Sequence, residues 1–72
     1  MQYLVIIEAN GDGSGFGAYV PDLPGCVATG RTSAEAKETI AFSIPLHLES
    51  LRAHGEAVPE PVSTAELVEV AA

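Results

Sequence analysis

Three short apolar segments in the N-terminal half of the chain predict β-strands. "QYLVIIEA" (2–9) is rich in β-branched residues and is apolar on both faces, as expected for a strand covered on both sides. "NGDGSG" (10–15) is a glycine-rich turn, and "FGAYV" (16–20) resumes the extended pattern, which together predict a hairpin. "CVATGR" (26–31) follows a Pro-Gly corner and predicts a third strand.

A long helical pattern follows and begins with a capping box, "TSAE". The Thr32 hydroxyl can accept a hydrogen bond from the Glu35 amide, and the Glu35 side chain can reach back. Apolar residues then recur every three or four positions, which predicts a helix that runs to His54 and is ended by Gly55. Pro45 lies inside this pattern and removes one backbone hydrogen bond, so the sequence predicts either a kink there or two shorter helices.

The last part of the chain predicts one more strand. "AVPEPVS" (57–63) must be extended, because its prolines push the preceding residues out of helical geometry, and "AELVEV" (65–70) is strand-like. A right-handed crossover from the helix would lay this strand beside the first one and parallel to it. The predicted fold class is α+β, in the order β-β-β-α-β, with a four-stranded mixed sheet (3-2-1-4) and one helix on one face. Residues 1–72 are expected to form a single domain.

One helix covers only one face of such a sheet, so half of the first strand's apolar side chains need another cover. A chain of 72 residues builds only a small core, and its single cysteine excludes an internal disulfide that would stabilise it. These features predict a homo-oligomer, either a dimer or a tetramer, in which Leu4 and Ile6 face the other subunit.

The charge of the chain narrows the classes of partner. Ten acidic residues against three basic ones give a formal net charge of -7, which opposes direct binding to nucleic acid and favours a basic protein partner. The N-terminus has no positive region and only a short apolar run, so the sequence predicts neither a signal peptide nor a membrane segment. The expected location is the cytoplasm.

Candidate catalytic groups are present, but each lacks the companions that catalysis needs. Cys26 with either histidine of the chain has no third group to orient the base, so a half-buried structural cysteine is the better interpretation. The glycine-rich turn fails as a calcium loop because its twelfth position is Pro21. Glu8 and Asp22 alone are too few ligands for a two-metal nuclease. We therefore expect no enzymatic activity, no metal and no cofactor.

The stretch "YVPDLPGC" (19–26) is a candidate for binding rather than catalysis. Its prolines restrict φ, Asp22 favours an Asx-type turn and Gly25 permits a left-handed conformation, which together predict a stiff corner. A rigid exposed corner loses little entropy when it docks on a partner, and Asp22 and Leu23 would make the main contacts. The predicted partner-binding residues are Tyr19, Asp22, Leu23, Pro24, Gly25 and Cys26.

The chain resembles the HicB antitoxin family over residues 3 to 62. The resemblance rests on the combination of "YLVIIE", "FGAYVPDLPGCVATGRTSAEA" and the helix end "HGEAVPEP". It implies a partial ribonuclease-H-like domain that binds and neutralises a small, basic, messenger-RNA-cleaving toxin of the HicA type. Family members commonly add a C-terminal DNA-binding domain, for which we expect no room in this chain. Pro45 departs from the family's uninterrupted helix.

Two alternatives to this interpretation stay open. One is a vestigial metal-dependent RNA nuclease that uses Glu8 and Asp22 as ligands, and the other is a solitary oligomeric scaffold without a toxin partner. The leading interpretation is a non-enzymatic, antitoxin-like binding module that masks a HicA-like toxin and makes no direct contact with nucleic acid or membrane.

Overall fold

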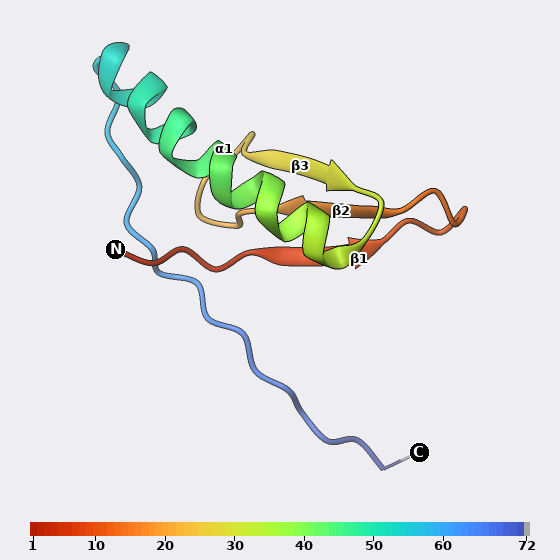
Figure 1. Ribbon diagram of the computed structural model, residues 1–72. Helices are drawn as coiled ribbons and strands as arrows, with labels where there is room; N and C mark the ends of the chain where they lie inside the picture. Colours follow the sequence, from red (N-terminus) through yellow and green to blue (C-terminus); the bar gives the residue numbers. More distant parts are fainter. Residues whose placement is uncertain (72) are drawn as a thin grey trace.

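The first three elements form an antiparallel sheet (Figure 1). The computed structural model describes residues 1–71, and its strands are β1 (Ile6–Ala9), β2 (Phe16–Tyr19) and β3 (Val27–Gly30). The strand order is β1-β2-β3, and the central β2 pairs antiparallel with both neighbours. The three predicted strands of the N-terminal half are confirmed, although each is shorter than the apolar segment that predicted it.

Glycines and short polar side chains build the turn between β1 and β2. The Asn10 amide donates to the Gly15 carbonyl (2.8 Å), and Gly13 and Gly15 have positive φ angles of 78° and 126°. Hydrogen bonds from the side chain and the amide of Ser14 lower the pKa of Asp12 below its ordinary value. The polar groups of this segment are therefore engaged within the turn itself, as expected for a hairpin tip.

The fourth element, α1 (Ser33–Ala53), is one helix of 21 residues. The Thr32 hydroxyl accepts a hydrogen bond from the Glu35 amide (3.0 Å), which confirms the predicted cap. The Glu35 side chain reaches back one residue beyond the cap and accepts from the Arg31 amide (3.1 Å). Within the described residues, 1–71, no helix combines the length and the apolar character that crossing a membrane requires.

Pro45 does not divide the helix, so the alternative of two shorter helices is wrong. A proline inside a helix costs about 3 kcal/mol, because a backbone hydrogen bond is lost and the ring crowds the preceding turn. In α1, however, Ile40 and Ile44 before the proline and Leu48 after it all pack against the core. Contacts on both sides of Pro45 therefore hold the two halves of the helix on one sheet.

The C-terminus of α1 ends in the hydrogen-bond pattern of a Schellman motif. The Gly55 amide donates to the Arg52 carbonyl (3.1 Å), and the Glu56 amide donates to the Leu51 carbonyl (2.9 Å). Gly55 has a φ of 69°, in the left-handed region that a residue without a side chain adopts at little cost. His54 is the C-cap, so the predicted end of the helix is confirmed.

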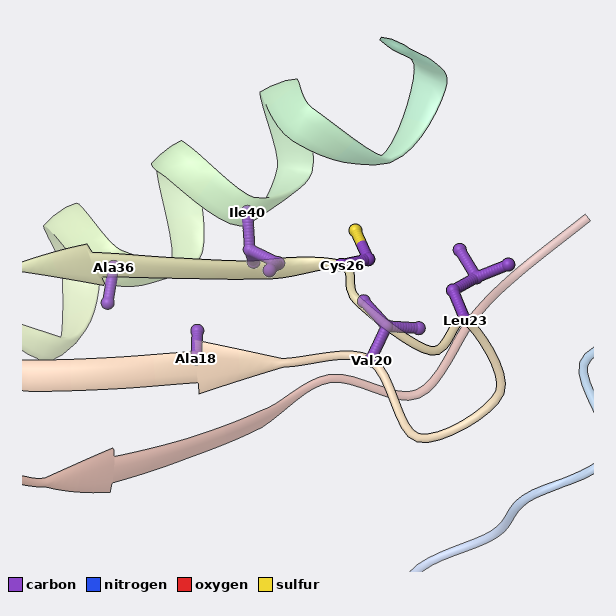
Figure 2. Packing of buried hydrophobic residues seen from close by; sticks show 6 residues of the cluster. All are labelled: Ala18, Val20, Leu23, Cys26, Ala36 and Ile40. Atoms are coloured by element: carbon purple, nitrogen blue, oxygen red, sulfur yellow. The ribbon is translucent and has the colours of Figure 1, made fainter. Parts of the chain in front are cut away.

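The helix covers one face of the sheet, and the core lies between them. Tyr3, Val5 and Ile7 pack against this core, so the alternating residues Leu4 and Ile6 lie on the opposite face of the sheet. The side chains of the core extend from the sheet to the helix and into the corner after β2 (Figure 2). The fully buried residues are Ala18, Val20, Leu23, Cys26, Ala36 and Ile40.

Residues 65–70 do not form the predicted fourth strand. After the helix, the chain returns past the N-terminus, where the Tyr3 hydroxyl donates to the Pro59 carbonyl, and then runs away from the sheet (Figure 1). The four-stranded mixed sheet in the order 3-2-1-4 is therefore wrong for this chain, and the observed sheet is three-stranded and antiparallel. The physical reason is that residues 62 and 63 are hydrogen-bonded to the corner after β2 rather than to β1.

Candidate functional site

The corner between β2 and β3 consists of two consecutive tight turns. The Leu23 amide donates to the Val20 carbonyl (3.0 Å), and the Cys26 amide donates to the Leu23 carbonyl (3.0 Å). A further bond from the Val20 amide to the Cys26 carbonyl (3.2 Å) closes the loop. In the second turn Pro24 precedes Gly25, whose φ of 84° suits the third position of a type II turn. The corner is therefore internally hydrogen-bonded, as its turn-forming residues predict.

The side chains of this corner point in two directions. Leu23 is only 1% exposed and Cys26 is also buried, so both belong to the core (Figure 2). Leu23 is therefore not the exposed apolar tip that the sequence predicted. The double turn carries its side chain inward, into the same cluster as Ile40, where burial of a leucine is favourable. Pro24 and Gly25, at the tip of the second turn, are exposed.

Asp22 is engaged by a distant part of the same chain. Its carboxylate accepts hydrogen bonds from the Ser63 amide (2.9 Å), the Ser63 hydroxyl (2.7 Å) and the Val62 amide (3.1 Å). These bonds, the two from Ser63 first, hold the pKa of Asp22 below its ordinary value. Sequence reasoning missed this role because the partners lie 40 and 41 residues further along the chain. Asp22 fastens the segment that follows the helix to the corner.

The candidate catalytic residues are not brought together. Burial raises the pKa of the Cys26 thiol, which disfavours the reactive thiolate. Glu8 lies opposite Gly17 at the start of β2, whereas Asp22 follows the other end of β2 and is occupied by Ser63. Among residues 1–71, no group of three or more His, Cys, Asp or Glu side chains is placed to hold a metal ion. The structure therefore pairs neither Glu8 with Asp22 nor Cys26 with an activating charge.

The face of the sheet opposite α1 is open and partly apolar. The strand register sets Ile6, Tyr19 and Val27 side by side across the three strands, and Tyr19 and Val27 are exposed. A shallow groove of about 520 Å³ crosses this face beside Gly17, which contributes no side chain to fill it. We call this surface the open sheet face; it consists of Leu4, Ile6, Tyr19 and Val27.

The outer face of α1 is a mixed apolar and acidic surface that sequence reasoning missed. Phe42 is 72% exposed and Leu46 is 54% exposed, although both are large apolar residues. Three exposed glutamates share this face of the helix, because together with Phe42 and Leu46 they follow one another at spacings of three or four residues. A shallow depression of about 480 Å³ lies beside Phe42. We call this surface the outer helix stripe; it consists of Glu35, Glu38, Phe42, Leu46 and Glu49.

A signal for the outer helix stripe was present in the sequence. Ile40 and Ile44 are four residues apart and pack on the sheet. Phe42 and Leu46 repeat the same spacing two residues out of phase, which places them on the opposite side of the helix. A second apolar row on one helix indicates a second surface, which the sequence analysis did not consider.

Comparisons with known proteins cover nearly the whole chain. A protein-family model described as "HicB-like antitoxin of bacterial toxin-antitoxin system" matches residues 3–71. A UPF0150 protein of Thermoplasma acidophilum is 42% identical over 59 residues, which are 82% of this chain and 84% of that protein. A UPF0150 protein of Synechocystis sp. is 41% identical over 58 residues, which are 81% of this chain and 72% of that protein. The family match includes all three strands and the helix.

Proposed function

The chain belongs to the HicB-like antitoxin family of bacterial toxin-antitoxin systems, and from this premise we propose that it is a non-enzymatic binding module. It neutralises a small, basic, messenger-RNA-cleaving toxin of the HicA type by masking it. The proposal includes the family relationship of the fold, with the three strands and the helix as part of a ribonuclease-H-like arrangement. It also implies a cytoplasmic location, because a toxin of this type acts on messenger RNA.

The outer helix stripe is the observation that carries the proposal. Phe42 and Leu46 are exposed at its centre, and the three exposed glutamates lie before and after them on the same face of the helix. Protein interfaces commonly have an apolar centre in which aromatic residues contribute most of the affinity, with a polar rim around it. Two large side chains exposed in this way gain nothing from the fold of their own chain, but would lose their contact with water against a partner.

The charge of the chain supports a basic partner for this surface. With a formal net charge of -7, the protein attracts a basic molecule from a distance and repels nucleic acid and other acidic surfaces. The glutamates at the rim of the outer helix stripe give that attraction a local target. Such a complex should form faster and bind more tightly at low salt, because mobile ions screen the attraction.

The corner after β2 lies against the flank of α1, between the sheet and the outer helix stripe. A Cβ atom at Gly25 would lie 4.0 Å from the ring of His47, the helix residue that follows Leu46. We include the tip of the second turn, Pro24 and Gly25, in the proposed contact with the toxin. The remaining members of the corner support that contact by holding its shape: Asp22, Leu23 and Cys26.

Self-association forms the second part of the proposal. Leu4 and Ile6 lie on the face of the sheet that the helix leaves uncovered, next to the exposed Tyr19 and Val27. We propose that these residues contribute to the interface of a dimer or a tetramer, because a second copy would remove them from water. Tyr19 belongs to this surface rather than to the toxin contact, since it lies opposite the helix.

Calorimetric titration with a toxin tests the proposed function. The probe is a small basic toxin of the HicA type, inactivated at its catalytic histidine. Phe42→Ala and Leu46→Ala are each expected to weaken binding about tenfold or more, the loss typical of residues at the centre of an interface. Glu38→Lys is expected to weaken binding at low salt and to flatten its salt dependence, because one attractive charge becomes repulsive.

Val27→Ala is the matched control, since it removes an equally exposed apolar side chain from the opposite side of the molecule. It should leave the affinity for the toxin unchanged. The outer helix stripe would be excluded as the docking surface if Phe42→Ala bound the toxin with unchanged affinity. The same would follow if the affinity changed neither with salt nor with Glu38→Lys. Absence of any complex with a toxin of this type would overturn the proposed function itself.

A further inference from the structure

The C-terminal segment leaves the body of the protein as an extended chain (Figure 1). Leu67 is 103% exposed, Val68 is 80% exposed and Val70 is 77% exposed. The radius of gyration is 14.0 Å and the longest dimension is 48 Å. A compact domain of this length has a radius of gyration of about 11 Å. The radius of gyration is larger than this because the C-terminal segment packs on no other part of residues 1–71.

The sequence of this segment is that of a strand rather than of a disordered tail. "AELVEV" (65–70) contains no glycine or proline, and its leucine and valines favour an extended, half-buried backbone. Its side chains alternate between two faces, and each face carries apolar residues, Leu67 on one and Val68 with Val70 on the other. In the structure its backbone is already extended but belongs to no sheet.

The chain also contains a sheet edge with which such a strand could pair. Among residues 1–71, β1 is an edge strand that pairs only with β2, so its other edge is free there. The segment around it, "QYLVIIEA" (2–9), lacks the lysines, prolines and bulges that normally protect an edge from pairing with another chain. Both of its faces carry apolar residues, as do both faces of the segment 65–70.

Within one chain, the segment 65–70 does not reach the free edge of β1. The bonds from Val62 and Ser63 to Asp22, together with the bond from Tyr3 to Pro59, fix the point at which the segment leaves the body. Beyond that point the segment diverges from β1 (Figure 1). These hydrogen bonds thus keep the unpaired segment 65–70 away from the unprotected edge of β1 in the same chain.

We propose that residues 65–70 of one chain pair with the free edge of β1 in a second copy, and that the exchange is reciprocal. A two-fold axis pairs each segment 65–70 with the β1 edge of the other chain at the same time, so the assembly closes as a dimer. Each three-stranded sheet gains its fourth strand from the partner. The inference gives a specific contact to the self-association proposed above, and does not depend on toxin binding.

Sedimentation equilibrium of the full chain and its variants tests the strand exchange. Val68→Pro removes a backbone donor from the segment without touching the body of the protein, so it should raise the dimer dissociation constant about tenfold or more. Phe42→Ala, which truncates an exposed apolar side chain elsewhere, should leave that constant unchanged. Salt should strengthen the dimer, because two chains of charge -7 repel each other, whereas the toxin complex should weaken.

Cross-linking identifies the strand that is paired. Glu8→Cys in one preparation and Glu66→Cys in another are mixed and treated with a short bismaleimide, with the wild type, whose only cysteine is the buried Cys26, as control. A covalent dimer containing one of each variant is expected. The double variant Glu8→Cys/Glu66→Cys is treated in the same way. If the mixed single variants give no covalent dimer and the double variant cross-links only within one chain, the segment folds back on its own β1 and the exchange is overturned. A dimer that Val68→Pro leaves intact would overturn it as well, while leaving the open sheet face as the interface.

Discussion

At the scale of single residues, Asp22, Leu23 and Cys26 lie close together in sequence, but their surroundings differ. The Asp22 carboxylate binds Ser63, the Leu23 side chain fills the core, and the Cys26 thiol lies among apolar side chains that raise its pKa. Burial, rather than residue type, therefore decides what each of them does. A cysteine in this position is a small apolar core residue and not a nucleophile.

Cys26 is expected to be unreactive in the folded protein. An aromatic disulfide reagent should modify it slowly in native buffer and rapidly after unfolding in urea, since the thiolate form is disfavoured by burial. Cys26→Ser should destabilise the fold by about 1 to 3 kcal/mol, because the hydroxyl would be buried without a partner. Cys26→Ala adds no polar group and should cost less. Rapid modification under native conditions would contradict this view of the core.

At the scale of elements, the approach of α1 to β3 depends on one position without a side chain. A Cβ atom at Gly30 would lie 2.9 Å from the Ala36 Cα atom and still closer to the Ala36 amide nitrogen. Ala36 itself is fully buried at this crossing. The first turn of the helix can therefore rest directly on the strand, which closes one end of the core.

Gly30→Ala should destabilise the fold by about 1 to 3 kcal/mol, because backbone atoms of the helix would have to move to make room for the methyl group. Gly17→Ala is the matched control in the neighbouring strand, where the nearest atom to an added Cβ would be the Asn10 Oδ1 at 3.8 Å. That variant should lose no stability in urea unfolding followed by circular dichroism. Equal stability of the two variants would show that the helix can shift freely on the sheet.

At the scale of the whole molecule, three surfaces remain for partners after the chain has folded. They are the outer helix stripe, the open sheet face and the free segment 65–70, and they lie on different sides of the protein. A molecule arranged in this way can present its helix to a toxin while its sheet joins a second copy. The hydrogen bonds between Ser63 and Asp22, which we call the Asp22 anchor, hold the chain just before the free segment against the corner after β2.

Acid should release this anchor. The pKa of Asp22 is lowered in the folded state, so its bonds stabilise the anchored segment at neutral pH and are lost as the pH falls through that depressed value, below 3.8. The amide resonances of Val62 and Ser63 should titrate together in this range. Asp22→Asn should abolish the titration at both amides, while the Ser14 amide continues to report Asp12. Amide shifts of Val62 that do not change with pH would argue against the anchor.

The sequence by itself determined those features that depend on neighbours along the chain. The three N-terminal strands, the Thr32 cap, the stop at Gly55 and the hydrogen-bonded corner all rest on contacts within a few residues, or on the period of apolar positions. The excess of acid and the family resemblance are likewise properties of the sequence alone.

Only the tertiary structure decided which surface each side chain meets. It buries Leu23, keeps the helix continuous through Pro45 and leaves 65–70 unpaired, because each outcome depends on segments far apart in the sequence. The bond between Asp22 and Ser63 is the clearest case, since neither residue predicts the other until the chain brings them together. A local pattern can specify a strand, but its partner is set by where the rest of the chain, or a second copy, lies.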